Sequence, residues 1–344
     1  MLTYILKRIA LMLPTLLGAL SITFVVMQFV PGGPVEQIMA EVRAGSGGDS
    51  GGYRAGRDTD AKQIAELKKL YGFDKPAHER YVDMLVNFAR FDLGRSFMHN
   101  KDVWQLIKEK LPVSISLGIW SFLLSYLISI PLGIAKAMHE GTRFDTVTTL
   151  AVLVGYAIPG FVLGILLIVL FAGGTFWDVF PLRGLTSDNW ADLGWGARIR
   201  DYFWHLALPL TCLSIHSFAV ITMLTKNTVV EEIRKQYVLV ARAKGLSQQR
   251  VLYRHILRNA LLPLVTHFPA AFVGAFFTGS ILIETLFSLD GMGLLGYEAI
   301  VRRDFPVVLG SLYLFTLIAV VTKLISDILY RVVDPRVQFG SVSK

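Results

Sequence analysis

Cysteine, charged residues and nucleotide-binding motifs are scarce in this chain of 344 residues. The single cysteine, Cys212, lies in an apolar segment, so neither an intrachain disulfide nor a cysteine-based metal site can form. Charged residues make up 17% of the sequence, whereas soluble domains contain about 25%. The phosphate-binding pattern GxxxxGK followed by Ser or Thr does not occur. We therefore expect no enzyme, and in particular no ATPase.

Apolar residues, by contrast, are abundant and clustered. They make up 53% of the chain, and the mean hydropathy is +0.52. Runs of about 20 apolar residues recur, and each can cross a hydrocarbon core of about 30 Å. The sequence therefore predicts an all-α integral membrane protein, with one span broken at Pro159. Its six expected spans cover about residues 9–30, 112–135, 147–171, 206–224, 264–286 and 307–328.

Basic residues set the expected orientation of these spans. The segment from Lys226 to Arg258 holds eight Lys or Arg residues against two acidic ones, which is typical of a cytoplasmic loop. Lys7 and Arg8 precede the first span, so six spans place both termini in the cytoplasm. We interpret the net charge of +8 as topology information, and expect no nucleic acid, because no aromatic-basic platform for stacking bases is present.

A long polar region follows the first span and is expected outside the cytoplasm. The predicted divisions are an N-terminal end and first span at 1–30, an extracytoplasmic cap at 31–111, a core of spans at 112–330 and a cytoplasmic tail at 331–344. Three amphipathic helices, at 60–71, 77–91 and 103–110, are expected in the cap.

The cap also contains a Gly-rich linker at 44–56. Its Gly48-Asp49-Ser50-Gly51-Gly52 matches the surroundings of the nucleophile in trypsin-like proteases. A nucleophilic Ser50 would need a histidine base and a carboxylate on a rigid scaffold, and no histidine precedes it. A flexible linker is the favoured interpretation, and a serine protease is the alternative.

The most informative stretch runs from Tyr237 to Pro263, between two apolar spans. Good helix formers extend from about Thr228 to Ala243, and Lys244-Gly245 is typical of a helix end. A second helix is expected after Ser247. Its apolar face consists of Val251, Leu252 and Ile256. The rest of its surface is basic and carries Arg250, Arg254 and Arg258. A basic amphipathic loop held near anionic membrane lipid would explain this pattern.

The same stretch supports a second interpretation, because ARAKGLS followed by RHILRNALLP resembles the coupling loop of ABC-importer permeases of the dipeptide, oligopeptide and nickel branch. In that family a short helix after the glycine docks into a groove on the cytoplasmic ATPase. The general pattern begins Glu-Ala-Ala, but here Leu239 and Val240 precede Ala241, and Pro263 lies later than the general spacing. This departure is the form shown by the peptide branch.

The resemblance implies a coupling loop at 227–262. The residues implied to couple to the ATPase are Ala241, Arg242, Ala243, Lys244, Gly245, Leu246, Ser247, Arg250 and Arg254.

Further similar segments occur in the same order along nearly the whole chain: PGGPVEQIM, YGFDKP, DLGRSF, KLPVSISLG, GYAIPGF, FPLRGL, GSILIETLFSLDGMGLLGYEA and DPR. The resemblance implies the fold of a type I ABC-importer permease in the bacterial inner membrane, with a helical periplasmic cap. It also implies a second homologous permease subunit, two ATPase domains that bind ATP and Mg, and a periplasmic solute-binding protein. This chain would itself bind no cofactor.

Within that branch, the similarity is greatest to the permease of the microcin C and oligopeptide importer. Peptide uptake by alternating access is therefore expected, and a dipeptide or nickel permease is the alternative.

An ion-coupled secondary transporter is the other class of transporter to consider. Such carriers keep carboxylates or histidines in mid-membrane, whereas Glu284 lies at a span end. It could line a gate, although a solvated or capped position is favoured. The candidate gate or periplasmic-loop residues are Glu284, Asp290, Gly291 and Gly293. The histidines in or beside the spans fit no metal spacing, and we interpret each as packed or hydrogen-bonded: His205, His216 and His267.

Overall fold

The computed structural model describes residues 2–29, 74–174, 176–277 and 281–333. In these ranges the secondary structure is helical, apart from an isolated bridge between Arg95 and Asp102. The expected helix at 60–71, the linker at 44–56 with Ser50, and residues 334–344 of the tail lie outside the described part. The longer helices are α1 (Leu2–Phe29), α4 (Ala77–Ala89), α5 (Val103–Met138), α6 (Arg143–Ala157), α7 (Gly160–Phe171), α8 (Trp195–Ile233), α12 (Leu262–Phe277), α14 (Met292–Val301) and α15 (Phe305–Val333).

The chain divides into two compact units. The first comprises Met1–Lys110 and Leu295–Val320, and the second comprises Leu111–Leu294 and Val321–Lys344. In the first unit, α4 packs on α1 through Tyr81, whose ring lies 5.2 Å from that of Phe24 and whose hydroxyl lies 2.5 Å from Ser21 Oγ. The helix expected at 77–91 is thus confirmed as α4, which packs on α1 within this unit.

A buried aspartate orders the loop of the first unit that precedes α5. The Asp304 carboxylate is 1% exposed and accepts hydrogen bonds from Ser96 Oγ at 2.5 Å, Phe97 N at 3.1 Å and Met98 N at 3.3 Å. A buried carboxylate needs such partners. This part of the unit is therefore fixed by a polar contact between segments more than 200 residues apart in sequence.

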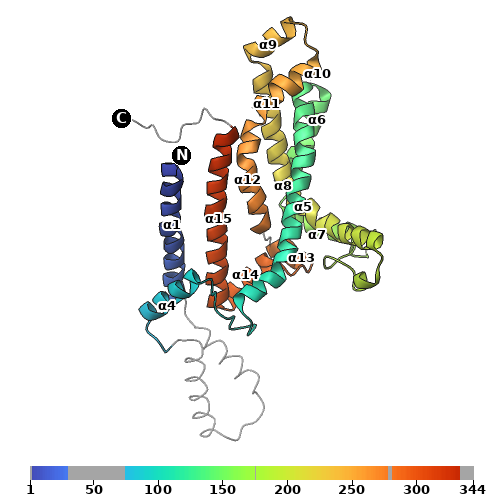
Figure 1. The fold of residues 1–344 in the computed structure, drawn as a ribbon. Helices are drawn as coiled ribbons and strands as arrows, with labels where there is room; N and C mark the ends of the chain where they lie inside the picture. Colours follow the sequence, from blue (N-terminus) through green and yellow to red (C-terminus); the bar gives the residue numbers. More distant parts are fainter. Residues whose placement is uncertain (1, 30–73, 175, 278–280, 334–344) are drawn as a thin grey trace, which may run out of the picture. The chain divides into compact units, whose positions relative to one another are not determined.

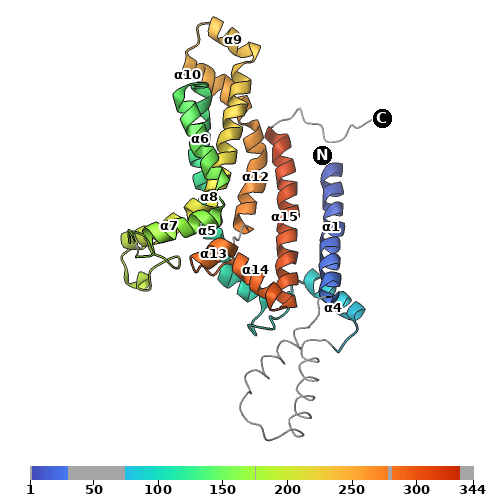
Figure 2. The same ribbon diagram turned by 180° about the vertical axis from the view of Figure 1, so that it is seen from behind.

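The second unit is organised around two long helices, α5 and α8, which Figures 1 and 2 show running beside α6 and α12. At 1.5 Å per residue, the 39 residues of α8 extend roughly 58 Å, well beyond a hydrocarbon core of about 30 Å. The span predicted at residues 206–224 lies inside α8, and the helix extends beyond it at both ends. The separate helix predicted at 103–110 is also wrong, because α5 continues through Pro112 without a break, with Val103, Leu106 and Ile107 all buried.

Four helical segments of the described part are long and apolar enough to span a membrane: Leu6–Phe29, Val103–Met138, Trp195–Ile233 and Phe305–Ile328. Helices α6 and α7 pass the same test only as a pair, and are bent by 97°. The break predicted at Pro159 is thus confirmed, since Pro159 directly precedes α7. The expected span at 264–286 corresponds to α12 and the short α13 (Ile281–Leu286), on either side of residues outside the described part.

Close packing explains the two glycines at the start of α7. A Cβ atom added to Gly160 would lie 2.8 Å from the Cys212 carbonyl oxygen on α8, and one added to Gly164 would lie 3.3 Å from Leu286 on α13. Cys212 is itself buried, in a core that α5, α8 and α13 share. The GxxxG spacing therefore serves helix packing.

Candidate functional site

The basic stretch that stands out in the sequence forms a compact unit beyond the ends of α5, α6 and α8, at the top of Figure 1. It consists of α9 (Gln236–Ala243), α10 (Gln248–Val251), a π-helical turn η2 (Leu252–Ile256) and α11 (Leu257–Ala260). We call residues 236–260 the basic unit. The single helix predicted from Thr228 to Ala243 is wrong, because α8 ends at Ile233 and the chain is extended at Lys235 (φ −74°, ψ 147°) before α9 begins.

The predicted helix, glycine turn and second helix are confirmed. Gly245 has a φ of +77°, a conformation that side chains with a Cβ rarely adopt, and its N–H donates to Arg242 O at 2.9 Å. Ser247 then caps the next helix, with its Oγ accepting from Arg250 N at 3.4 Å. These caps hold α9 and α10 at a fixed angle.

The inner face of the basic unit is apolar and packs onto the ends of α5 and α8. The buried residues of this core are Ala137 of α5, Val229 of α8, and Val238, Ala241, Val251, Leu252, Ile256, Leu257 and Ala260 of the unit itself. The face predicted from Val251, Leu252 and Ile256 is therefore confirmed. Burial of such side chains contributes about 1.5–3 kcal/mol each, so the basic unit is firmly attached to the helices that it follows.

The outer face is cationic and exposed. Most residues that the resemblance assigned to ATPase coupling lie on it, namely Arg242, Ala243, Lys244, Gly245, Ser247, Arg250 and Arg254. Two others do not: Ala241 is buried in the core, and Leu246 packs partly against it. Tyr253 is 70% exposed between these arginines. The sequence interpretation missed this residue, although an exposed aromatic among basic side chains is typical of a protein-binding surface.

A polar contact closes the junction between α8 and the basic unit. The Glu232 carboxylate accepts hydrogen bonds from Lys235 Nζ and from the Tyr237 hydroxyl, which in turn accepts one from Asn259 Nδ2 at 3.3 Å. Burial and the bond to Glu232 raise the pKa of Tyr237, so its hydroxyl stays a donor at neutral pH. The same carboxylate raises the pKa of Lys235. Tyr237 thereby ties α9 to both α8 and α11.

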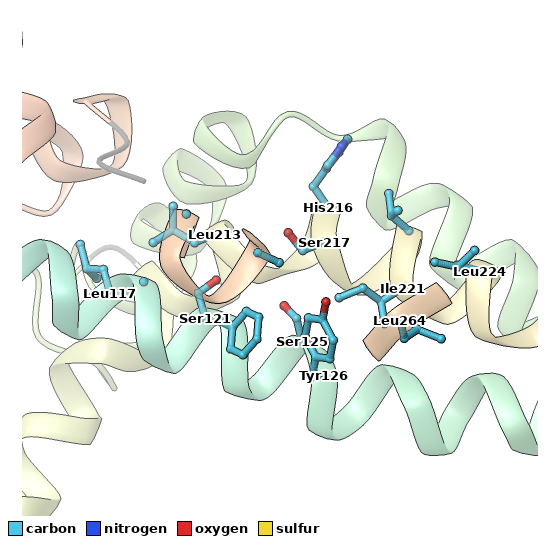
Figure 3. Close-up of a pocket in the computed structure, with 15 residues that line it drawn as sticks. Leu117, Ser121, Ser125, Tyr126, Leu213, His216, Ser217, Ile221, Leu224 and Leu264 are labelled. Carbon is cyan, nitrogen blue, oxygen red and sulfur yellow. The ribbon is translucent and has the colours of Figure 1, made fainter. Parts of the chain in front are cut away.

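The second compact unit of the chain also contains a groove of about 700 Å³, which lies between α5, α8 and α12. Figure 3 shows Ser121, Ser125 and Tyr126 of α5 pointing to the side on which Ser217 of α8 lies, with His216 directed away from them. Leucine, isoleucine and valine side chains form most of the remaining wall. Among the described residues that line the groove none is an acid, a lysine or an arginine. We call this feature the hydroxyl groove.

Glu284, the strongest candidate from the sequence for a gate, is fully buried. Its carboxylate accepts from Leu294 N at 2.7 Å and from Gly293 N at 3.4 Å, and so caps the start of α14. A Cβ atom on Gly291 would lie 2.7 Å from the Glu284 carboxyl carbon. Of the two positions favoured from sequence, the capped one is confirmed and the solvated one is wrong. Asp290 is exposed beside this cap.

The described histidines that were singled out are packed against protein groups. His205 is buried, with Nδ1 2.8 Å from Asp201 O, and the His216 ring stacks on Tyr156 at 4.3 Å. The side chain of His267 lies outside the described part. Within the described residues, no group of three or more His, Cys, Asp or Glu side chains is arranged to hold a metal ion.

The fold and this site define a helical membrane protein with a basic, firmly attached unit at one end of its long helices. Residues 129–339 match the family described as "Binding-protein-dependent transport system inner membrane component", and the chain belongs to that family. It is 52% identical to the peptidoglycan transport system permease protein YejB of Agrobacterium fabrum, and 49% identical to the inner membrane ABC transporter permease protein YejB of Escherichia coli O157:H7. Each alignment covers 98% of both chains.

More distant relatives also align over nearly the whole length of this chain. The dipeptide transport system permease protein DppB of Escherichia coli K12 is 33% identical, over 98% of this chain and 99% of that protein. Among solved structures, a chain of the MetNI methionine ABC transporter in an inward-facing conformation matches with a TM-score of 0.50 and 15% identity, over 67% of this chain and 97% of that one. This last likeness supports the shared fold.

Proposed function

We propose that the chain is a permease subunit of an ATP-driven importer that takes up peptides across the bacterial inner membrane. The observation that carries the proposal is full-length similarity, at 52% and 49% identity, to two proteins named as transport permeases. The relatives named for their cargo carry peptidoglycan, dipeptides, di- and tripeptides or oligopeptides. All of these solutes contain peptide bonds, so the cargo class is peptide-containing solutes, including oligopeptides and peptide antibiotics such as microcin C.

The hydroxyl groove supports this cargo class. A passage for many peptides has to hydrogen-bond to backbone amides without selecting side-chain charge. Serine and tyrosine hydroxyls both donate and accept, and Ser121, Ser125, Tyr126 and Ser217 supply them among apolar neighbours. A bare Ni²⁺ ion would instead prefer nitrogen and oxygen ligands in a defined set, and within the described residues no group of three or more His, Cys, Asp or Glu side chains is arranged to provide one.

The basic unit supports dependence on a partner ATPase. Its exposed arginines and Tyr253 form a docking surface, and its apolar core transmits force to α5 and α8. In this proposal ATP binding by two cytoplasmic ATPase domains moves the basic unit, and α5 and α8 rock between inward-open and outward-open arrangements. A second homologous permease subunit completes the pathway, and a periplasmic binding protein delivers the peptide. ATP and Mg belong to the ATPase partners.

The remaining expectations belong to the same proposal. Six spans would place both termini and the basic unit in the cytoplasm, with a helical periplasmic cap after the first span. The capped Glu284 loop, with Asp290, Gly291 and Gly293, would then face the periplasm as part of a gate. An orientation test with a membrane-impermeant thiol reagent on cysteines introduced at Arg250 and at Asp290 should label these two positions from opposite sides.

Reconstitution with the partner subunits tests the function. In vesicles that contain this chain, its partner permease and the ATPases, peptide-loaded binding protein should stimulate ATP hydrolysis and peptide should accumulate. Uptake that continues without ATP and follows a proton gradient would show a secondary transporter instead. Accumulation of Ni²⁺ and not of peptides would reassign the cargo within the branch.

A further inference from the structure

A buried cluster of three charged side chains joins α5, α6 and α8. Asp145, in the first turn of α6, lies 3.1 Å from Lys136 Nζ of α5 and 2.7 Å from Lys226 Nζ of α8. Lys136 is fully buried, and the side chains of Asp145 and Lys226 are only 9% and 15% exposed. We call these residues the buried triad.

The hydrogen bonds of the buried triad are largely satisfied. Lys136 Nζ also donates to Asp145 O at 3.0 Å and to Thr148 Oγ1 and Thr149 Oγ1 at 2.8 and 2.7 Å. Lys226 Nζ lies 2.7 Å from both carboxylate oxygens of Asp145. Three charges removed from water carry a desolvation cost that their attraction only partly offsets. Such a cluster is weak evidence for added stability and better evidence for one specified arrangement of helices.

Along α5 and α8, the buried triad lies between the basic unit and the hydroxyl groove. Lys136 directly precedes Ala137, which packs in the core of the basic unit, and Val229 of the same core follows Lys226 by less than one helical turn. On the other side, Leu224 of the groove precedes Lys226 by two residues. All force that passes from the basic unit along α5 and α8 therefore crosses the level of the triad.

Backbone packing at this level is also close. A Cβ atom on Gly133 would lie 2.6 Å from Thr225 Cβ and 2.8 Å from Thr222 O, so α5 and α8 touch one turn before the triad. Glycine permits this approach. The triad adds α6 to the pair, because the Asp145 carboxylate is the partner of both lysines, and Thr148 and Thr149 of the same helix also accept from Lys136.

We propose that Lys136, Asp145 and Lys226 are positioning residues for transport, which lock α5, α6 and α8 into one body so that movement of the basic unit reaches the groove undiminished. The proposal rests on the proposed function, since it assumes an ATPase that moves the basic unit. Loss of the lock lets α6 and α8 slip against each other, so ATP hydrolysis continues while the groove no longer follows.

The chain contains its own matched control. Arg234 and Glu140 form a second ion pair at 3.0 Å between the end of α8 and the loop before α6, and their side chains are 69% and 45% exposed. Exposed pairs of this kind contribute little because water screens them. Glu140→Gln removes the exposed link between the same two segments and leaves the buried triad intact.

The experiment compares Lys226→Met, Lys226→Arg, Asp145→Asn and Glu140→Gln in the reconstituted complex, with peptide uptake per ATP hydrolysed as the readout. Lys226→Met keeps an apolar stem and leaves Asp145 paired with Lys136, whereas arginine can still bind both carboxylate oxygens. We expect uptake per ATP to fall at least about fivefold in Lys226→Met and Asp145→Asn, as for an allosteric coupling free energy of ordinary size. Lys226→Arg and Glu140→Gln should match the wild type.

Three results would overturn the proposal. Unchanged uptake per ATP in an assembled Lys226→Met complex would show that no lock is needed. Assembly of the Lys226→Arg complex with failure of the Lys226→Met complex would assign the triad to folding. An equal fall in Glu140→Gln would show a general charge effect. If the wild-type complex itself takes up no peptide with ATP, the proposed function fails instead, independently of the variants.

Discussion

The basic unit packs against the ends of α5 and α8, the two long helices that also line the hydroxyl groove, but the two surfaces differ in chemistry. The basic unit presents arginines, a lysine and Tyr253 outward over a tightly packed apolar core. The groove presents hydroxyls and aliphatic side chains, without an acid, lysine or arginine among the described lining residues. A surface of fixed charge on a rigid support suits one specific partner, whereas an uncharged, hydroxyl-lined surface suits many cargoes. The buried triad lies between the two.

The largest effect is expected from a substitution that disrupts the rigid basic unit. In Gly245→Val a β-branched residue would have to adopt a φ of +77°, which costs more than about 1–2 kcal/mol and so reduces coupled uptake at least about tenfold. A Cβ atom there meets nothing within 4 Å, so strain in the backbone is the cause. The measurement is ATP-driven peptide uptake by reconstituted vesicles.

Gly245→Asn is the control for this variant, because asparagine tolerates the left-handed conformation. Its uptake should stay close to that of the wild type. If instead Gly245→Val transports normally while remaining in the membrane, the basic unit acts only as a lipid-bound loop.

A smaller effect is expected when a positive charge, like those of the basic unit, is introduced into the hydroxyl groove. Ser217 is exposed in the groove, and Ser217→Lys should reduce uptake of cationic peptides by roughly tenfold, since a like charge about 4 Å away costs about 1 kcal/mol in water and more near a protein surface. Uptake of acidic peptides should be unaffected or improved. Competition between peptides that differ only in one Lys or Glu measures the ratio, and an unchanged ratio would place the pathway elsewhere.

Removing charge from the outer face of the basic unit should have a more modest effect. Arg250 and Arg254 are exposed on consecutive helical turns, and Arg250→Ala with Arg254→Ala should weaken binding of the ATPase about three- to tenfold, because charges at an interface rim act mainly on association. The deficit should shrink as salt is raised, which titration of detergent-solubilised complex would show. Equal weakening at all salt concentrations would contradict an electrostatic role.

The smallest effect concerns the junction between α8 and the basic unit. Tyr237→Phe removes the donor to Glu232 and the acceptor for Asn259, at an expected cost of about 0.5–1.5 kcal/mol to local stability, because a hydrogen bond is lost while Lys235 still pairs with the carboxylate. Amide hydrogen exchange in α9 and α11 should quicken while the spans keep their protection. Uniform protection in the variant would show that the contact contributes nothing.

The sequence predicted the parts of this architecture that depend on neighbours in the chain. The turn at Gly245 and the apolar face of Val251, Leu252 and Ile256 follow from conformational preference and helical periodicity alone. The break before α9 was missed, because its residues are acceptable helix formers. Tyr237, just after the break, bonds to Asn259, 22 residues further along the chain, and no local pattern indicates that contact.

Contacts between residues far apart in the sequence could not be predicted either. Lys136 looks like an ordinary basic residue at the end of a span, and only folding brings it to Asp145 and to Lys226, a further 81 residues along the chain. Glu284 was expected at a span end. Its burial under Gly291 and the start of α14 requires the chain to fold back over it, which no periodicity in the sequence predicts. The groove likewise arises from three helices, and no local pattern marks its serines.

Photo-cross-linking would show which molecules contact the basic unit and which contact the hydroxyl groove. A benzophenone amino acid in place of Tyr253 on the basic unit, and the same probe in place of Ser217 in the groove, would be irradiated in the assembled complex with peptide and ATP. We expect adducts of the first probe with the ATP-hydrolysing subunit and of the second with peptide. Peptide adducts at Tyr253 with no ATPase adduct there would show that the basic unit is not the docking surface for the ATPase.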